Sequence, residues 1–252
     1  MAPTKFQAQV LSKGEERFQQ YQRLHNKHFG TSASGRILDF GCGAGGFMLA
    51  AHNNGLEAWG IETDSERQRQ YLNIADRNFP DLRDRFHLYD GRLMPYSSNH
   101  FDAIYSWFVF EHVTDPQCSV REIVRTLAPG GTVVLHADDV RNNWDGHAAA
   151  PWPPYLPREF AAAYLEGLGK GDQSEFITNY VVYISTPTMV DILTTFGMEI
   201  VYANAAPERP AIPAALYVTN DDEARALGRK MRDSTVQGPT ENMTIVARKP
   251  LT

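Results

Sequence analysis

The sequence predicts an α/β protein: a seven-stranded, mostly parallel, doubly wound sheet with an inserted helical and aromatic lid. Two observations predict this fold class. Short apolar segments alternate with helical segments between residues 36 and 137, as in consecutive βαβ units. A glycine-rich loop, Gly41-Cys-Gly-Ala-Gly-Gly46, follows the first predicted strand and opens the first helix. Open parallel sheets bind ligands at such turns, beyond the carboxyl ends of the strands.

The predicted elements follow this alternation along the chain. An amphipathic helix over 15–29 belongs to an N-terminal helical cap over 1–30. A core over 31–137 is expected to contain strands over 37–40, 57–61, 86–89, 101–106 and 132–136, with helices over 46–53, 65–78 and 116–127. The core resumes over 187–252, with a helix over 188–196 and strands over 198–202 and 243–247.

The βαβ pattern fails after Ala137. Residues 138–186 are interpreted as a lid that binds the acceptor, meaning the small molecule on which the protein acts. This segment is rich in Ala, Pro and Gly, and its aromatic residues include Trp144, Trp152, Tyr155, Phe160, Tyr164 and Tyr180. A lid over the strand ends would exclude water and select the substrate, while local core packing is the alternative. A second insertion is predicted over 207–239, with a charged helix over 222–232.

Composition limits the class of partner. The formal net charge of −6 argues against a broad grip on nucleic acid, so the expected partner is a small-molecule acceptor. The first residues lack the apolar stretch of a signal peptide, and no apolar run approaches the roughly 20 residues of a membrane helix. Cys42 and Cys118 form no disulfide framework. We therefore expect a cytoplasmic monomer or homodimer without membrane insertion.

The glycine loop alone fits two kinds of cofactor. Gly41, Gly43 and Gly46 match the GxGxxG fingerprint of dinucleotide binding, with Glu62 about 20 residues onward. Asp39 separates the two, because a pyrophosphate about 4 Å from this carboxylate would be repelled by roughly 4 kcal/mol at an effective dielectric of about 20. A cofactor with a cationic ammonium and sulfonium fits better. Its carboxylate would suit the helix N-terminus, and a turn that binds nothing is the remaining alternative.

The segment Asp39-Phe-Gly-Cys-Gly-Ala-Gly45 resembles the first motif of class I S-adenosylmethionine-dependent methyltransferases, whose usual form is DxGCGxG. Later segments are similar to further motifs of this family: Trp59–Asp64, Asp90–Tyr96, Trp107–Val113 with its Glu-His-Val, and Leu127-Ala-Pro-Gly-Gly131. The resemblance covers about 30–137. It implies S-adenosylmethionine as cofactor and S-adenosylhomocysteine as product.

The resemblance also implies a set of cofactor-binding positions. Glu62 would receive hydrogen bonds from the ribose hydroxyls, and Asp90 would contact the adenine amino group. A helix-capping or solvent-facing role is the alternative for Glu62, and a turn role for Asp90. The cofactor-binding residues carried over are Asp39, Gly41, Cys42, Gly43, Glu62, Thr63, Asp90, Gly91, Arg92, Ser106 and Trp107.

The expected reaction moves a methyl group to an oxygen, or in second place a nitrogen, of a small molecule such as a sugar or a natural-product intermediate. Alignment and water exclusion contribute most to such a displacement. For a hydroxyl acceptor, His112 and His136 are the candidate bases, with packing beneath the cofactor as the alternative for His112. The rivals are a nicotinamide-dependent oxidoreductase and a non-catalytic binding protein of the same fold.

No metal is predicted. Some relatives bind a divalent ion through an ExxEH arrangement, but Phe108 occupies the position of its first Glu. The spacing of His136 with Asp138 and Asp139 does not make a convincing ligand set either.

Overall fold

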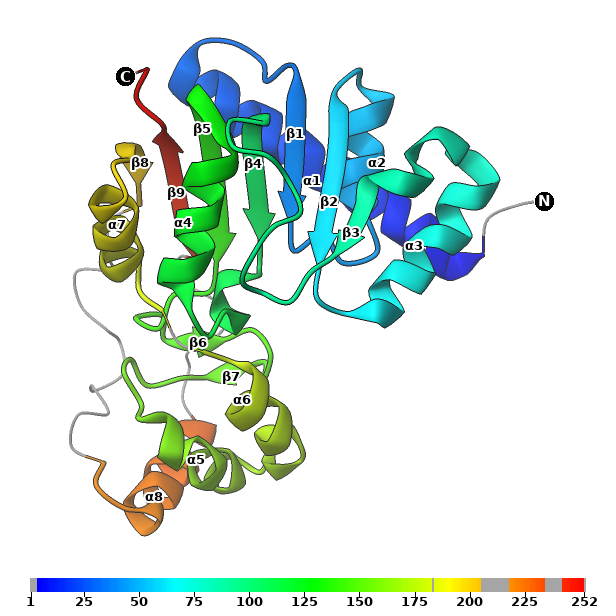
Figure 1. Ribbon diagram of the computed structural model, residues 1–252. Coiled ribbons are helices and arrows are strands. Elements are labelled where there is room, and N and C mark those ends of the chain that lie inside the picture. The colour runs from blue at the N-terminus through cyan, green and yellow to red at the C-terminus, as the bar shows by residue number, and fades with distance from the viewer. Residues whose placement is uncertain (1–3, 183, 205–217, 234–241, 252) are drawn as a thin grey trace.

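The computed structural model describes residues 4–182, 184–204, 218–233 and 242–251 (Figure 1). Its centre is one seven-stranded sheet in the order β3-β2-β1-β4-β5-β9-β8. The strands are β1 (Arg36–Phe40), β2 (Glu57–Glu62), β3 (Phe86–Leu88), β4 (Phe101–Trp107), β5 (Leu127–Ala137), β8 (Glu199–Ala203) and β9 (Met243–Arg248). Pairing is parallel from β3 to β5, and β9 is antiparallel to both of its neighbours. The predicted fold class is therefore confirmed.

Helices cover both faces of this sheet (Figure 1). One face packs against α1 (Lys5–Phe29), α2 (Gly46–Asn53) and α3 (Ser65–Asn78), and the other against α4 (Pro116–Thr126) and α7 (Thr186–Thr195). Two short 3-10 helices, η1 (Pro80–Arg85) and η2 (Phe110–His112), lie in the connections. Among the described residues, no helix is both long and apolar enough to cross a membrane.

Helix α1 is longer than its predicted range of 15–29 and begins ten residues earlier. The side chain of Thr4 accepts a hydrogen bond from the backbone of Gln7, and Oε1 of Gln7 accepts one from the backbone of Thr4. This reciprocal capping box satisfies two otherwise unpaired donors at the helix start. The helix ends at Gly30, whose left-handed conformation has a φ of 74°.

Close packing holds α1 across the start of α2. A Cβ atom on Gly14 would lie 2.1 Å from the carbonyl oxygen of Gly46, so the two backbones touch at this crossing. Tyr21 of α1 packs edge-on against Phe47, which stacks on Tyr105 of β4 at a centroid distance of 3.9 Å. These ring pairs fix α1 beside the glycine loop.

The lid segments lie beyond the arrowheads of the parallel strands (Figure 1). They comprise β6 (Trp144–Asp145), β7 (Ala150–Pro151), η3 (Arg158–Phe160), α5 (Ala161–Leu168), η4 (Gly171–Gln173), α6 (Ser174–Tyr180) and α8 (Asp221–Arg232). Helices α5 and α8 share one apolar cluster, although the sequence places them in two separate insertions. A Cβ atom on Gly228 would lie 2.2 Å from the carbonyl oxygen of Tyr164, so the glycine permits this contact.

The sequence-predicted insertion over 207–239 is only partly described. Its charged helix corresponds to α8, whereas 207–217 and 234–239 lie outside the described residues.

Candidate active site

A cavity of about 1110 Å³ lies at the carboxyl ends of β1, β2 and β4. Its walls come from α1, the glycine loop, the segments that follow β2, β3 and β4, and the lid helix α6. Cofactor and substrate pockets commonly enclose about 300–1,000 Å³. The cavity therefore has room for a cofactor of nucleoside size and a second small molecule beside it.

The glycine loop forms one wall through its backbone. Gly41 has a φ of 75°, and a Cβ atom there would lie 2.3 Å from a methyl group of Val109, so only glycine fits. Gly43 also has a positive φ, of 54°, but no atom lies within 4 Å of the position of its missing Cβ. Since Gly43 lines the cavity, a ligand can approach this backbone closely.

The carboxylate of Glu62 lies at the end of β2 and lines the same cavity. Its Oε2 accepts a hydrogen bond of 2.9 Å from the backbone of Gly43, and its Oε1 accepts one of 2.7 Å from that of Thr63. Asp90, after β3, is exposed and also lines the cavity. Its Oδ1 accepts hydrogen bonds from the backbone of Arg92 and Leu93, which lower the pKa of Asp90. Asp90 thus shapes a turn and faces the cavity as well.

Nine of the eleven sequence-predicted cofactor positions line this one cavity: Gly41, Cys42, Gly43, Glu62, Thr63, Asp90, Gly91, Arg92 and Trp107. Asp39 and Ser106 do not line it, because both are buried within their strands. Burial raises the pKa of Asp39 to about 7, and the positive charge of Arg17 only partly opposes this shift. Any influence of Asp39 on a ligand in this cavity is therefore electrostatic and not a direct contact.

The structure separates the two histidines that the sequence offers as bases. His112 lines the cavity, whereas His136 does not. The ring of His136 stacks on Trp107 at 3.9 Å, and its Nδ1 lies 2.9 Å from the hydroxyl of Thr244. Burial, together with the positive charge of Arg17, lowers the pKa of His136 to about 4, so this ring is neutral at pH 7.

His112 joins the core to the lid. Its Nδ1 lies 2.7 Å from the carbonyl oxygen of Tyr180, the last residue of α6. A carbonyl only accepts hydrogen bonds, so Nδ1 carries the proton and Nε2 keeps its lone pair in the neutral ring. Burial lowers the pKa of His112, which favours this neutral form.

The lid aromatics divide into two groups. Trp152 and Tyr164 are buried in the lid's own core and pack edge-on at 5.3 Å. Phe176 and Tyr180 are exposed and line the cavity beside His112. Local packing and cavity lining, the two interpretations that the sequence left open, thus apply to different residues.

The sequence predicts that the N-terminal helix closes over the cofactor together with the lid, but it names no residue of this helix as part of the site. This helix lines the cavity with Phe6, Gln9, Val10, Lys13, Gly14 and Arg17. Positions 6, 10, 13, 14 and 17 are three or four residues apart and therefore share one face of the helix. All of these positions except Arg17 lie before residue 15, where the predicted helix begins. Arg17 adds a cation near Asp39 and His136.

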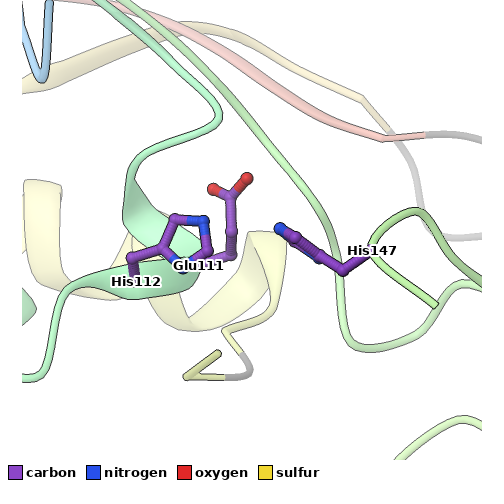
Figure 2. A group of neighbouring side chains, drawn as sticks. All are labelled: Glu111, His112 and His147. Carbon is purple, nitrogen blue, oxygen red and sulfur yellow. The ribbon is translucent and has the colours of Figure 1, made fainter. Parts of the chain in front are cut away.

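A second group of side chains lies next to the cavity. The sequence pattern predicts no metal, yet Glu111, His112 and His147 each place a potential ligand atom within 4.8 Å of the others. Figure 2 shows the carboxylate of Glu111 between the two imidazole rings. His147 lies between β6 and β7, so sequence separation hid this grouping.

Comparisons with known proteins bear on the family and the fold. Residues 14–169, more than half of the chain, match the family model of a methyltransferase domain. Norajmaline N-methyltransferase of Rauvolfia serpentina is 31% identical over 107 residues, which cover 42% of this chain and 37% of that protein. The chloroplastic tocopherol O-methyltransferase of Arabidopsis thaliana is 29% identical over 180 residues, covering 70% of this chain and 49% of that protein. The matched part of the chain thus spans between a third and a half of these two relatives.

A solved structure supports the fold. The cyclase SpnF superposes with a TM-score of 0.59 at 19% identity, covering 92% of this chain and 82% of that chain. Such a likeness shows the architecture and not the reaction. The match to the family model, together with the strand order and the glycine loop, shows that the chain belongs to the class I S-adenosylmethionine-dependent methyltransferases.

Proposed function

We propose that the protein transfers the methyl group of S-adenosylmethionine to an oxygen, or in second place a nitrogen, of a small molecule. One observation carries this proposal: the open backbone of Gly43 lies beside the carboxylate of Glu62 in a cavity large enough for cofactor and acceptor. The bound cofactor would supply an electrophilic methyl group on a sulfonium. The protein's contribution would then be to align the two molecules and exclude water.

The cavity suggests how the cofactor lies. We assign the ribose hydroxyls to Glu62 and the adenine to the segment of Asp90, Gly91 and Arg92. Cys42 and Thr63 flank this nucleoside end, while Trp107 lies toward the sulfonium. We assign the carboxylate of the methionine part to Arg17, because α1 brings this residue into the same cavity, where its positive charge also acts on the buried Asp39.

The acceptor would bind on the lid side of the cavity. Exposed aromatic faces of Phe176 and Tyr180 meet His112 there, and they suit a sugar ring or a flat apolar natural product. For a hydroxyl acceptor, Nε2 of His112 is the base within reach of the cavity, and it would take the proton as the oxygen–methyl bond forms. We assign His136 to packing beneath Trp107 and not to proton transfer.

Location and assembly remain predictions. The free thiols of Cys42 and Cys118 are consistent with a cytoplasmic protein, and a monomer or homodimer is expected.

Ligand-dependent stabilisation tests the proposal against both rivals. At about 100 times its dissociation constant, S-adenosylhomocysteine should stabilise the fold by about 2.7 kcal/mol. That increment corresponds to a melting-temperature rise of about 5–10 °C for a chain of this size. NADH at the same concentration should produce no shift, because the buried, partly ionised Asp39 lies behind the glycine loop.

Each alternative has a distinct outcome. Stabilisation by NADH alone would establish the oxidoreductase, and stabilisation by neither ligand would favour the non-catalytic protein. If S-adenosylhomocysteine binds, transfer of a radiolabelled methyl group to a panel of small hydroxyl and amine acceptors would identify the acceptor atom. Binding without transfer to any acceptor of either kind would contradict the proposed reaction.

A further inference from the structure

We propose that Glu111, His112 and His147 bind one divalent transition-metal ion where the sheet meets the lid. This ligand set has two imidazoles and one carboxylate. The site draws on three positions that the sequence separates: Glu111 and His112 in η2, and His147 in the turn between β6 and β7. It does not depend on the methyl transfer proposed for the neighbouring cavity.

The first observation is the state of Glu111. Its side chain is 1% exposed, and neither carboxyl oxygen has a hydrogen-bond partner among the described residues. A buried ionised carboxylate without a partner is costly, so it must bind either a proton or a cation. A cation beside Glu111 would supply the missing partner of this carboxylate.

The second observation is the orientation of His112. Its Nδ1 donates to the carbonyl of Tyr180 at 2.7 Å, which leaves the lone pair of Nε2 available. Histidines that bind metals almost always donate their other ring N–H to a carbonyl or carboxylate in this way. The lid therefore fixes the tautomer that a metal needs.

The third observation is the charge around His147. Its Nδ1 lies 3.5 Å from Oδ2 of Asp138 and 3.8 Å from Oδ1 of Asp145, both on the lid side. This Nδ1 atom has no hydrogen-bond partner among the described residues. Together with Glu111 and with Asp139, which is ion-paired with Arg141, the two aspartates bring four carboxyl groups around a cavity of about 10 Å³, roughly the size of one water molecule. A divalent ion would offset the mutual repulsion of these carboxyl groups.

The ligand types favour certain ions. Ligand atoms at about 2.0–2.2 Å from one ion lie about 3–4 Å apart, so the observed spacing of up to 4.8 Å needs only small side-chain rotations. Imidazole nitrogen favours Zn²⁺ or Fe²⁺ over Mg²⁺, which prefers an all-oxygen shell. We therefore expect Zn²⁺ to bind and Mg²⁺ to bind far more weakly.

The ion would have two consequences. It would tie the lid to the sheet, because its ligands come from both. It would also occupy Nε2 of His112 at the acceptor end of the cavity, so His112 could not then take a proton. In that state the ion itself would lower the pKa of an acceptor hydroxyl that binds to it.

Calorimetric titration of the untagged, chelator-treated full chain tests the site. Zn²⁺ should bind with a stoichiometry of one per chain and raise the melting temperature, and Mg²⁺ should do neither at the same concentration. Glu111→Gln and His147→Gln should each weaken Zn²⁺ binding at least tenfold, because even the loss of an outer-shell partner typically costs about 10–100-fold. Co²⁺ in place of Zn²⁺ should give a visible absorption band that both substitutions change.

Two substitutions serve as matched controls: Glu159→Gln on the exposed lid surface and His52→Gln in α2. Both should bind Zn²⁺ as the unaltered chain does. Circular dichroism should confirm that each variant is folded, and should Glu111→Gln fail to fold, His147→Gln carries the test. Absence of Zn²⁺ binding, or equal Zn²⁺ affinity in the folded variants, would overturn the proposal. Binding of S-adenosylhomocysteine, measured separately, keeps this result distinct from failure of the proposed function.

Discussion

The backbone N–H of Gly43 donates a hydrogen bond of 2.9 Å to Oε2 of Glu62. This contact joins the glycine loop after β1 to the end of β2. The other carboxylate oxygen, Oε1, accepts from the backbone N–H groups of Thr63 and Asp64 and, at 3.4 Å, from the hydroxyl of Thr63, so protein contacts orient both oxygens. A carboxylate oxygen has a second lone pair, which leaves acceptor capacity on Oε2. In the proposed cofactor complex one ribose hydroxyl would donate to Oε2, and the other would replace the Thr63 hydroxyl on Oε1.

Replacing Glu62 with Ala should weaken binding of S-adenosylhomocysteine by roughly 1.5–3 kcal/mol, because two charge-assisted hydrogen bonds would be lost. That loss corresponds to an affinity decrease of about 10–150-fold, measurable by calorimetry. Glu57→Ala is the matched control, since Glu57 begins the same strand at its exposed, opposite end. Equal affinities for Glu62→Ala and the unaltered chain would contradict the ribose assignment.

Arg17→Gln tests the other end of the cofactor. Loss of the guanidinium should weaken binding of S-adenosylhomocysteine by about 1.5–3 kcal/mol, the range for hydrogen bonds to charged groups. Methylthioadenosine has the same nucleoside but no carboxylate, so its affinity should hardly change. Calorimetry with both ligands therefore separates loss of the carboxylate contact from general damage to the cavity.

Arg23→Gln provides the control on the same helix, because Arg23 is exposed on α1 and does not line the cavity. If Arg17→Gln weakened both ligands equally, the carboxylate would have to bind elsewhere.

The α1–α2 crossing should tolerate no side chain at Gly14. A Cβ atom there would meet the carbonyl of Gly46 at 2.1 Å, and overpacking of this kind costs about 1–3 kcal/mol. Alanine recovers about 1 kcal/mol through its higher helix propensity. Gly14→Ala should therefore lower the melting temperature by a few degrees and, by moving α1, also weaken S-adenosylhomocysteine binding. Ser12→Ala, exposed on the same helix, should do neither.

Local signals in the sequence were sufficient for much of the fold. The helix ranges 46–53 and 65–78 are predicted as the structure has them. The structure shows that the side chain of Asp64 caps the second of these helices by accepting a hydrogen bond from the backbone of Glu66. The Thr4 to Gln7 capping box is an equally local signal, and it places the start of α1 ten residues before the predicted one. Strand β5 was predicted from 132 yet begins at Leu127, which pairs with Phe101 across the sheet. That extension depends on a neighbour and not on the segment itself.

The features that the sequence did not predict all depend on distant contacts. Packing of α5 against α8 joins segments about 60 residues apart through Gly167 and Gly228. The grouping of Glu111 with His147 depends on how the lid folds back on the sheet. Asp39 was expected to reach the ligand because its motif position suggested it, whereas its burial follows from the packing around β1. Motif spacing indicates which residues converge, and packing decides which of them stay accessible.

Asp39 should give the folded protein a measurable pH dependence. Its pKa is about 7 in the folded chain, against an ordinary value of 3.8, because burial penalises the carboxylate. Between these two values the unfolded chain releases a proton that the folded chain keeps, so stability is lost as the pH rises through this window. A shift of this size corresponds to at most about 4 kcal/mol, of which about 2–3 kcal/mol would be lost between pH 5 and 8.

Asp39→Asn removes this titration while keeping the shape of the side chain. Urea unfolding at pH 5 and pH 8 should show a smaller loss of stability in Asp39→Asn than in the unaltered chain, by about 2–3 kcal/mol. Other titrating groups are shared by both chains and cancel in this difference. Asp172→Asn, at an exposed position in the lid, should retain the full pH dependence. Parallel stability profiles for Asp39→Asn and the unaltered chain would mean that Asp39 is already ionised in the fold, with Arg17 compensating its burial.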